Sequence, residues 1–381
     1  MNPITLLQPP RIVFGNGCAP QCAELLALRG VKRVLLVSSA PVLPMLDEIR
    51  AALAEKGVAM IQTPPVDHEP TCALFDEVLR FARGEDVDGV LGVGGGSVID
   101  VAKLLAALVR GNQAVKDVIG INLLSGRELP LFCLPTTAGT GAEVSPNAIL
   151  LDEADDLKKG AVSPHLVPDA ALVDPLLTVT VPPAITAATG MDALTHCIEA
   201  YANKFAHPIV DTYALQGIRL ICKNLARAVR NGNDVEARAA LSLGSLYGGL
   251  CLGPVNTAAV HALAYPLGGR FRIAHGVSNA LLLPHVLRFN FSAAPARYAD
   301  IAVALGVLRN GSDLAAAEEG VELLTRLSRE CGVPQSLSEL KIPRTAIPAL
   351  AASAMQVQRL LKNNLRLLTE PDAAGIYEAA Y

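Results

Sequence analysis

The first half of the chain alternates short apolar runs with segments of helical period, and this alternation restricts the folds open to it. The apolar runs typical of buried strands include Arg33–Val37, Gly89–Val93 and Leu129–Leu134. Segments with helical periodicity, among them Cys72–Arg83 and Val98–Arg110, separate these runs. Short strands separated by helices predict an α/β fold, in which helices cover a parallel sheet.

The pattern changes at the proline-bearing segment Leu177–Pro183. Beyond it, strand-like runs give way to long stretches rich in Ala, Leu and Arg, such as Val235–Leu252. We therefore expect two domains, an α/β domain over residues 1–182 and an all-helical domain over residues 183–381. A chain of 381 residues has the length of about two domains.

The composition excludes several classes of protein and partner. Hydrophobic residues make up 51% of the chain and charged residues 18%, so the chain can bury large cores and is not intrinsically disordered. The net charge is −4, there is no Trp, and aromatic residues make up 4%. Such a chain has neither a basic field for phosphodiesters nor a stacking platform for bases, which argues against a nucleic-acid partner.

Two further features bear on location and redox state. The stretch Leu241–Gly269 contains no charged residue, but its prolines, glycines and polar side chains argue against a membrane span and predict a pair of buried helices. We see no secretory signal at the N-terminus and expect a cytoplasmic protein without a membrane partner. The eight cysteines are scattered; only Cys18 and Cys22 are close together, without the second pair that a zinc site needs. We expect reduced thiols within the core.

A glycine-rich loop follows the strand Gly89–Val93, in the string LGVGGGSVIDVAK. Gly94, Gly95, Gly96 and Ser97 would allow backbone N–H groups to approach an anion, and the helix that follows adds the positive end of its dipole. The string matches neither the P-loop motif nor the full Rossmann fingerprint, and a glycine turn without a ligand remains an alternative. Asp100 is a candidate cofactor-binding residue, or the second member of a capping box with Ser97.

A second loop, PTTAGTGAEVS, follows the strand that ends at Leu134. Open α/β sheets bind ligands at the carboxyl ends of their strands, although an ordinary polar turn is an alternative. Two such loops in one sheet favour a nucleotide site. Its candidate cofactor-binding residues from this loop are Thr136, Thr137, Thr140 and Ser145.

The helical half contains candidate metal ligands. Asp192 and His196 are four residues apart, which places them one turn apart on one face of a helix. His261 and His275 lie in apolar surroundings further along the chain. A capping pair and satisfied core histidines are the alternatives. Together the four residues would supply three nitrogen ligands and one oxygen ligand, a set suited to Fe(II), Zn(II) or a similar ion.

At these residues the sequence resembles the iron-containing (group III) alcohol dehydrogenase family. The resemblance extends over nearly the whole chain and is carried, in order, by GGGSVIDVAK, PTTAGTGAEVS, GMDALTHCIEAY and HALAYPLGGRFRIAHGVSNALLLPHVLRFN. It implies the dehydroquinate synthase-like fold, with an N-terminal dinucleotide-binding domain, an all-helical metal-binding domain and a site in the cleft between them. It also implies Fe(II), or Zn(II) or another divalent ion, together with NAD or NADP, and a homo-oligomer.

The family's functional residues carry over by position. The metal ligands fall on Asp192, His196, His261 and His275. The phosphate loop falls on Gly94, Gly95, Gly96 and Ser97, the second nucleotide loop falls on Thr136, Thr137 and Thr140, and a cofactor-side lysine matches Lys158.

Two positions depart from the family pattern. Many members have a histidine four residues after the third metal ligand, where this chain has Tyr265, so a proton would pass through the tyrosine hydroxyl or through water. Members that prefer NAD often have an acidic residue after the strand Arg33–Val37, where this chain has Ser38 and Ser39. Because Ser39 would not repel a 2′-phosphate, we predict that NADP is tolerated.

The resemblance implies a metal-dependent, NAD(P)-linked alcohol dehydrogenase or aldehyde reductase, acting on a small alcohol or aldehyde. A polyol or glycerol-type dehydrogenase, or non-redox chemistry of the dehydroquinate synthase kind, is the alternative within the superfamily. A non-catalytic nucleotide-binding protein with a structural metal is the alternative from another class.

Overall fold

The computed structural model describes residues 3–154 and 156–381, and the chain divides into two compact units. The α/β unit comprises Leu6–Thr137 and Gly141–Val179. The helical unit comprises Thr180–Tyr381, the short segment Ala138–Thr140 and an N-terminal segment that ends at Thr5.

A six-stranded sheet forms the centre of the α/β unit, in the order β1-β9-β6-β4-β2-β3. Every pairing in this sheet is parallel, which confirms the predicted fold class. Its strands are β1 (Ile12–Phe14), β2 (Arg33–Ser38), β3 (Ala59–Gln62), β4 (Gly89–Gly94), β6 (Leu131–Pro135) and β9 (Ala170–Val173).

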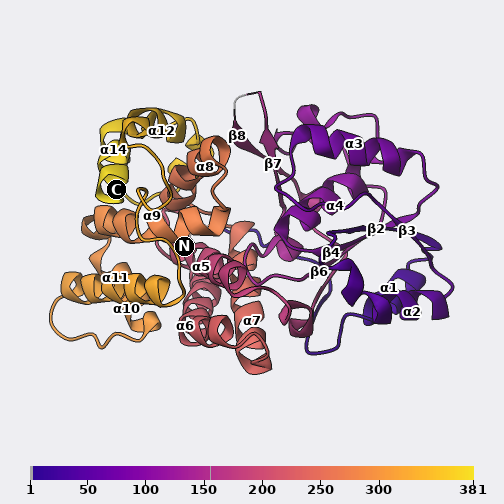
Figure 1. The fold of residues 1–381 in the computed structure, drawn as a ribbon, viewed down its shortest axis with the longest axis horizontal. Helices are drawn as coiled ribbons and strands as arrows, with labels where there is room; N and C mark the ends of the chain where they lie inside the picture. The colour runs from indigo at the N-terminus through magenta and orange to yellow at the C-terminus, as the bar shows by residue number, and fades with distance from the viewer. Residues whose placement is uncertain (1–2, 155) are drawn as a thin grey trace. The chain divides into compact units, whose positions relative to one another are not determined.

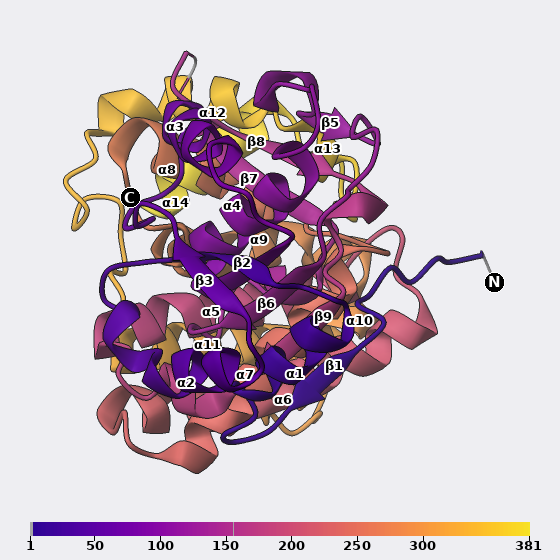
Figure 2. The same cartoon turned by 90° about the vertical axis from the view of Figure 1, so that its right-hand side faces the viewer.

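Helices cover both faces of this sheet, with α3 and α4 on one side and α1 and α2 on the other (Figures 1 and 2). Alternate residues of β2 belong to different cores: Leu35 lies in the cluster formed with α3 and α4, and Leu36 in the cluster formed with α1 and α2. Burial on both faces explains why the strands read as continuous apolar runs. The covering helices are α1 (Gln21–Leu28), α2 (Asp47–Glu55), α3 (Cys72–Arg83) and α4 (Gly96–Leu108).

A second, three-stranded sheet was not predicted. It consists of β5 (Gly120–Ile121), β8 (Leu157–Val162) and β7 (Asn147–Asp152), and β7 pairs with β8 in antiparallel register. Strand β8 contains Lys158, Lys159 and Gly160 and therefore lacks an unbroken apolar run of the kind that predicted β2, β4 and β6.

The helical unit encloses one continuous apolar core. Helices α5, α6 and α7 pack against one another, and α5 also packs against α9 (Figure 1). No strand longer than an isolated bridge occurs in the described residues after β9. The helices are α5 (Pro183–Tyr201), α6 (Pro208–Arg230), α7 (Val235–Leu252), α8 (Ala259–Phe271), α9 (His275–Asn290), α10 (Pro295–Leu305), α11 (Asp313–Glu330), α12 (Ile347–Ala354), α13 (Gln358–Leu361) and α14 (Glu370–Ala379).

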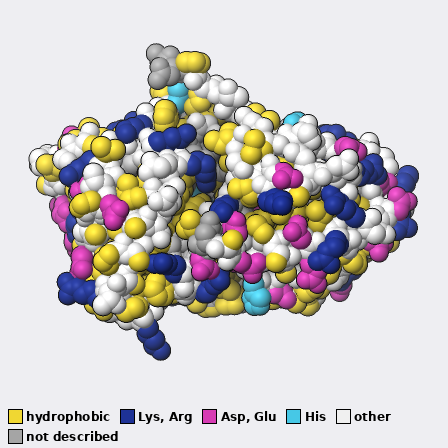
Figure 3. Space-filling view, turned by 90° about the horizontal axis from the view of Figure 1, so that it is seen from above, with side chains coloured by type: hydrophobic (Ala, Val, Ile, Leu, Met, Phe, Trp, Pro, Cys, Tyr) yellow, Lys and Arg dark blue, Asp and Glu magenta, His cyan; other side chains and the backbone are white. Residues whose placement is uncertain are grey.

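The uncharged stretch 241–269 is divided between α7 and α8, as the sequence predicted. Among the helices of residues 3–154 and 156–381, none reaches the length and apolar content of a membrane span. The cysteines are unpaired thiols, and burial raises the pKa of Cys22 and Cys133 to about 12. On the face seen in Figure 3, Lys and Arg side chains are interspersed with Asp and Glu, without a continuous basic area.

Candidate metal and nucleotide sites

Helix α5 presents Asp192 and His196 one turn apart on the same face, as their spacing predicted. The side chains are almost completely buried, with exposed fractions of 4% for Asp192 and 7% for His196. The Nε2 atom of His196 lies 4.0 Å from Oδ1 of Asp192.

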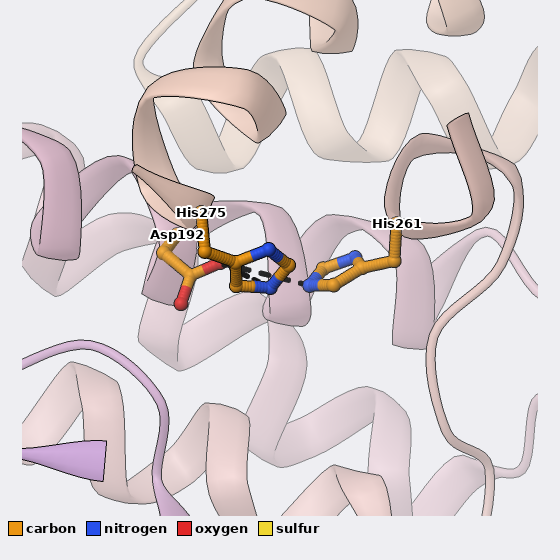
Figure 4. A group of neighbouring side chains, drawn as sticks. All are labelled: Asp192, His261 and His275. Carbon is orange, nitrogen blue, oxygen red and sulfur yellow. Dashed lines mark ion pairs between the residues drawn. The ribbon is translucent and has the colours of Figure 1, made fainter. Parts of the chain in front are cut away.

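Two histidines from other helices converge on the same carboxylate oxygen. The Nε2 atom of His261, in α8, lies 3.6 Å from Asp192 Oδ1, and that of His275, the first residue of α9, lies 3.7 Å from it. Figure 4 shows the carboxylate and these two rings directed toward one another. Of the four predicted ligands, Asp192, His261 and His275 have donor atoms that all lie within 4.8 Å of one another. His196 is adjacent to them, with its ring stacked on that of His261 at a centroid distance of 4.7 Å.

A glycine allows α9 to approach α5 closely enough for this convergence. A Cβ atom at Gly276 would lie 2.1 Å from the carbonyl oxygen of Ala188 in α5. Because no side chain fits there, glycine next to His275 permits the contact that places this histidine beside Asp192.

The charges of the group depend on one another. Burial by itself would raise the pKa of Asp192, but His196 and His275 hold that pKa well below its usual range. Burial lowers the pKa of His196 and thereby favours the neutral ring that can bind a metal. Burial also opposes the charged form of His261, yet the nearby carboxylates of Asp192 and Glu199 raise its pKa to about 9.

Asn279, one turn after His275 in α9, lies at the centre of this group. Its Nδ2 atom donates a hydrogen bond to Asp192 Oδ1 (2.6 Å) and lies 3.2 Å from Nε2 of both His261 and His275. The residue is fully buried. Asn279 was not among the predicted site residues, although it lies four residues after His275, the same spacing that relates Asp192 to His196.

Glu199 is a second buried carboxylate at this site and was not among the predicted site residues. It lies on α5, three residues after His196, and its Oε2 atom accepts a hydrogen bond from Nδ1 of His261 at 2.6 Å. The string GMDALTHCIEAY places Glu199 three residues after His196, and residues three or four positions apart share a helix face. This spacing could have identified Glu199 as a candidate site residue.

The group has the chemistry and spacing of a divalent-metal site. In a tetrahedral site with ligand distances of about 2.1 Å, neighbouring donor atoms are about 3.4 Å apart, and here the three imidazole nitrogens lie 3.6 to 4.0 Å from the carboxylate oxygen. These residues therefore fit a bound metal ion.

In the α/β unit, the two predicted loops meet at the carboxyl edge of the sheet. Gly94 ends β4 opposite Pro135 of β6, and the backbone N–H of Thr136 donates to the carbonyl of Gly94 (2.9 Å). A Cβ atom at Gly94 would lie 2.6 Å from the side chain of Val98, so glycine allows β4 to pack tightly against α4.

Helix α4 begins at Gly96 with Gly95 as its N-cap, so the capping box of Ser97 and Asp100 was wrong. Asp100 instead accepts a hydrogen bond from the backbone N–H of Ile149 (3.0 Å), and burial raises its pKa to about 6. The helix begins before Ser97, because Gly94 and Gly95 alone form the turn between β4 and α4. The N–H groups in the first turn of the helix have no intrahelical partner.

A fully buried lysine, Lys103 of α4, links this helix to the end of the second loop and the start of β7. Its Nζ atom donates to the carbonyl oxygens of Ser145 (2.7 Å) and Asn147 (2.8 Å), and to the hydroxyl of Ser145 (3.2 Å). Ser145 therefore contacts this lysine. Burial lowers the pKa of Lys103 and raises that of the neighbouring Glu143 to about 7.

The remaining candidate cofactor residues are distributed as follows. Ser39 follows β2, beside the end of β4, and is partly buried. Thr137 is also partly buried and lies beside Gly95, where a Cβ atom would be 3.5 Å from the Thr137 hydroxyl. Lys158, in β8, is buried and forms an ion pair with Glu69. Thr140 belongs to the helical unit.

Two family models match this chain. Residues 9–175 match the model of the family described as iron-containing alcohol dehydrogenase, and residues 186–381 match the C-terminal model of the Fe-containing alcohol dehydrogenase family. The chain belongs to the iron-containing alcohol dehydrogenase family. Its members include the long-chain-alcohol dehydrogenase 1 of Geobacillus thermodenitrificans, which is 39% identical, with alignment covering 100% of this chain and 98% of the relative.

Other members of the iron-containing alcohol dehydrogenase family confirm the fold. The 1,3-propanediol dehydrogenase of Klebsiella pneumoniae is 36% identical, over 97% of this chain and 96% of its own. The crystal structure of a 1,3-propanediol oxidoreductase has a TM-score of 0.96 at 36% identity, and an alcohol dehydrogenase from Oenococcus oeni has a TM-score of 0.96 at 30% identity. Each of these two superpositions covers 100% of this chain and 100% of the chain of the solved structure.

In this family member, Tyr265 lies one turn after His261 in α8 and is 6% exposed. Its ring lies 5.9 Å from that of His275, measured between centroids. His275 has the most exposed side chain of the candidate ligands, at 26%. Tyr265 and His275 are therefore neighbours on the more accessible side of the metal group.

Proposed function

We propose that the protein oxidises small aliphatic alcohols, and reduces the corresponding aldehydes, with Fe(II) as its metal and NAD or NADP as hydride carrier. Zn(II) or another divalent ion is the alternative metal. Residues 1–182 would bind the nucleotide and residues 183–381 the metal. The observation that carries the proposal is the convergence of three imidazole nitrogens on Asp192 Oδ1 within a buried helical core.

Asp192, His196, His261 and His275 would hold the metal, which supplies Lewis acidity toward a substrate oxygen. The residues of the site prepare it for that chemistry. Burial of Asp192 and His261 excludes water and so strengthens electrostatic interactions with a bound substrate. The partial exposure of His275 leaves one side of the group accessible.

Tyr265 would take part in proton transfer. Its ring neighbours that of His275, and a tyrosine hydroxyl can both donate and accept a hydrogen bond. The proton of the alcohol would pass through this hydroxyl, or through water that the hydroxyl orients.

The nucleotide would bind at the carboxyl edge of the six-stranded sheet. The backbone N–H groups of Gly95, Gly96 and Ser97 lie at the start of α4 and would donate hydrogen bonds to the pyrophosphate. Thr136, Thr137 and Thr140, with Lys158, would contribute polar contacts. Ser39 would accept either a ribose hydroxyl or a 2′-phosphate, so we propose that NADP is used as well as NAD.

The relatives guide the choice of substrate. Their names specify long-chain alcohols, 1,3-propanediol, methanol and lactaldehyde. Aliphatic alcohols, diols and their aldehydes are therefore the class that we propose for this chain, with glycerol-type polyols as the alternative. We further propose a homo-oligomer and a cytoplasmic location.

The test is a paired assay of metal and cofactor. Metal-free protein is reconstituted with Fe(II) or Zn(II), and NAD(P)H absorbance is followed with a panel of alcohols and aldehydes. We expect turnover only with metal, and its loss together with metal binding in Asp192→Ala. Asp152→Ala, which removes a carboxylate of a partly exposed ion pair, is the matched control and should behave as the wild type.

Turnover in metal-free protein would contradict the proposal. Tight nucleotide binding without turnover on any substrate of the panel would instead support a non-catalytic nucleotide-binding protein.

A further inference from the structure

We infer that Glu199 is a positioning residue for the metal site, which it serves by fixing His261 and the start of α8. The inference rests on the proposed metal-dependent function, but it concerns a side chain outside the set of four ligands. Glu199 acts through His261.

The contacts of Glu199 use both oxygens of its carboxylate. The Oε2 atom accepts hydrogen bonds from Nδ1 of His261 (2.6 Å) and from the backbone N–H of Ala258 (2.9 Å). The Oε1 atom accepts one from the backbone N–H of Val260 (2.6 Å). The side chain is 5% exposed, so these contacts replace almost all of its hydration.

Two of these bonds anchor the first turn of α8. N–H groups in the first turn of a helix have no intrahelical acceptor, and the methyl side chain of the N-cap residue Ala258 cannot accept a hydrogen bond. Glu199 supplies the acceptor from α5. The segment that carries His261 is thereby attached to the helix that carries Asp192 and His196.

The third bond fixes the ring of His261. With its proton on Nδ1 and directed at Glu199, the ring points Nε2 toward Asp192 Oδ1, 3.6 Å away. A rotation of the ring by half a turn would break the hydrogen bond to Glu199. Such a carboxylate also makes the opposite nitrogen a stronger ligand, and outer residues of this kind contribute about 10–100-fold to metal affinity.

Charge balance gives a further reason for a carboxylate at this position. A divalent ion held by Asp192 and neutral imidazoles would leave one uncompensated positive charge in a buried site. Glu199 supplies a second buried negative charge, in direct contact with one of the ligands. Buried charges are costly unless they are compensated nearby.

A role limited to the stability of α8 would predict different behaviour. Tyr377 provides the matched comparison, because its buried hydroxyl donates a hydrogen bond to the carbonyl of Leu263 in the same helix. Tyr377→Phe removes this bond to α8 without changing any contact of the ligand rings.

The experiment compares the full-length wild type, Glu199→Gln and Tyr377→Phe, each prepared free of metal. Co(II) and Zn(II) affinities are measured by competition with a chelator, the Co(II) visible spectrum reports ligand geometry, and calorimetry gives the unfolding temperature without metal. We expect Glu199→Gln to bind both ions about 10–100-fold more weakly and to alter the Co(II) spectrum. Tyr377→Phe should lower the unfolding temperature while its metal affinity stays within about twofold of the wild type.

Two results would overturn the inference: wild-type metal affinity in Glu199→Gln, or an equal loss of affinity in both variants. Should the Gln variant not fold, Glu199→Asp is judged by the same criteria, because it keeps the charge but is one methylene too short to keep all three bonds. None of these readouts requires turnover. A wild type that binds metal but oxidises no alcohol would contradict the proposed function and leave the role of Glu199 intact.

Discussion

Replacing Lys103 by Met removes the charged group that links α4 to Ser145 and Asn147 and keeps most of the aliphatic volume. The lysine is fully buried, and its three N–H groups are directed at the carbonyl and hydroxyl of Ser145 and the carbonyl of Asn147. Its charge also lowers the pKa of Asp100 and of Glu143. The variant therefore loses hydrogen bonds at every pH and charge compensation only where these acids are ionised.

The expected cost follows from these two contributions. A hydrogen bond to a charged group is worth roughly 1.5–3 kcal/mol, and leaving a buried acceptor without a partner costs about 1–3 kcal/mol. Since Met also avoids the desolvation of an ammonium group, we expect a net loss of about 2 kcal/mol when Asp100 and Glu143 are protonated. With both acids ionised, the loss should rise to roughly 4 kcal/mol, within the range for a buried charge deprived of its partner.

The pH dependence has a definite sign. In the folded protein, burial raises the pKa of Asp100 from 3.8 to about 6 and that of Glu143 from 4.5 to about 7. The folded state therefore binds more protons than the unfolded state between pH 3.8 and about 6 at Asp100, and between pH 4.5 and about 7 at Glu143. The stability that these protonated groups contribute is lost as the pH rises through the folded-state pKa values of about 6 and about 7. Without Lys103 both pKa values rise further, so the gap in stability between Lys103→Met and the wild type should widen from pH 5 to pH 8.

Calorimetry and circular dichroism are suitable measurements, because the chain has no Trp to report unfolding by fluorescence. For a unit of this size, 1 kcal/mol corresponds to about 2–4 °C, so at pH 8 we expect the unfolding temperature to fall by roughly 8–16 °C. Lys159→Met is the control, since its ion pair with Asp152 is about one-third exposed and worth at most about 1 kcal/mol. A loss in Lys103→Met that equals the control, or that is the same at pH 5 and pH 8, would refute the reasoning.

Three further predictions concern the metal site, cofactor choice and glycine packing. Asn279→Asp would place a second carboxylate against Asp192, where the amide now donates at 2.6 Å; thermal unfolding should show a less stable metal-free protein and a larger stabilisation by Zn(II) than in the wild type, and an unchanged metal-free transition would contradict this. Ser39→Asp should weaken NADP binding by about tenfold or more through charge repulsion while NAD affinity changes little, as measured by NAD(P)H fluorescence; equal effects on both cofactors would exclude the proposed contact. Gly94→Ala should cost about 1–3 kcal/mol through overpacking, whereas Gly126→Ala, whose Cβ meets nothing within 4 Å, should be nearly neutral in denaturant titrations.

The sequence predicted those features that depend on local periodicity. Buried strands of a two-sided sheet appear as unbroken apolar runs, which is why β2 and β4 were located almost to the residue. The short edge strand β1 was not located, because a run of three apolar residues is too short to distinguish a strand from a loop. The hairpin of β7 and β8 was not located either, because Lys158, Lys159 and Gly160 interrupt the apolar pattern of β8. The pairing of β1 also depends on a partner distant in the chain, since Phe14 pairs with Val173.

The metal group shows the same limit at the level of single residues. Asp192 and His196 could be paired by their helical spacing, but the positions of His261 and His275 depend on how α8 and α9 pack against α5. Part of that packing is decided by Gly276, where a single Cβ would lie 2.1 Å from the backbone of α5. No periodicity reveals such an approach, since a glycine's role depends on what lies opposite it. The types of candidate ligand could therefore be predicted from the sequence. The convergence of the three imidazole nitrogens on one carboxylate oxygen could not, because it depends on how the helices pack in the folded core.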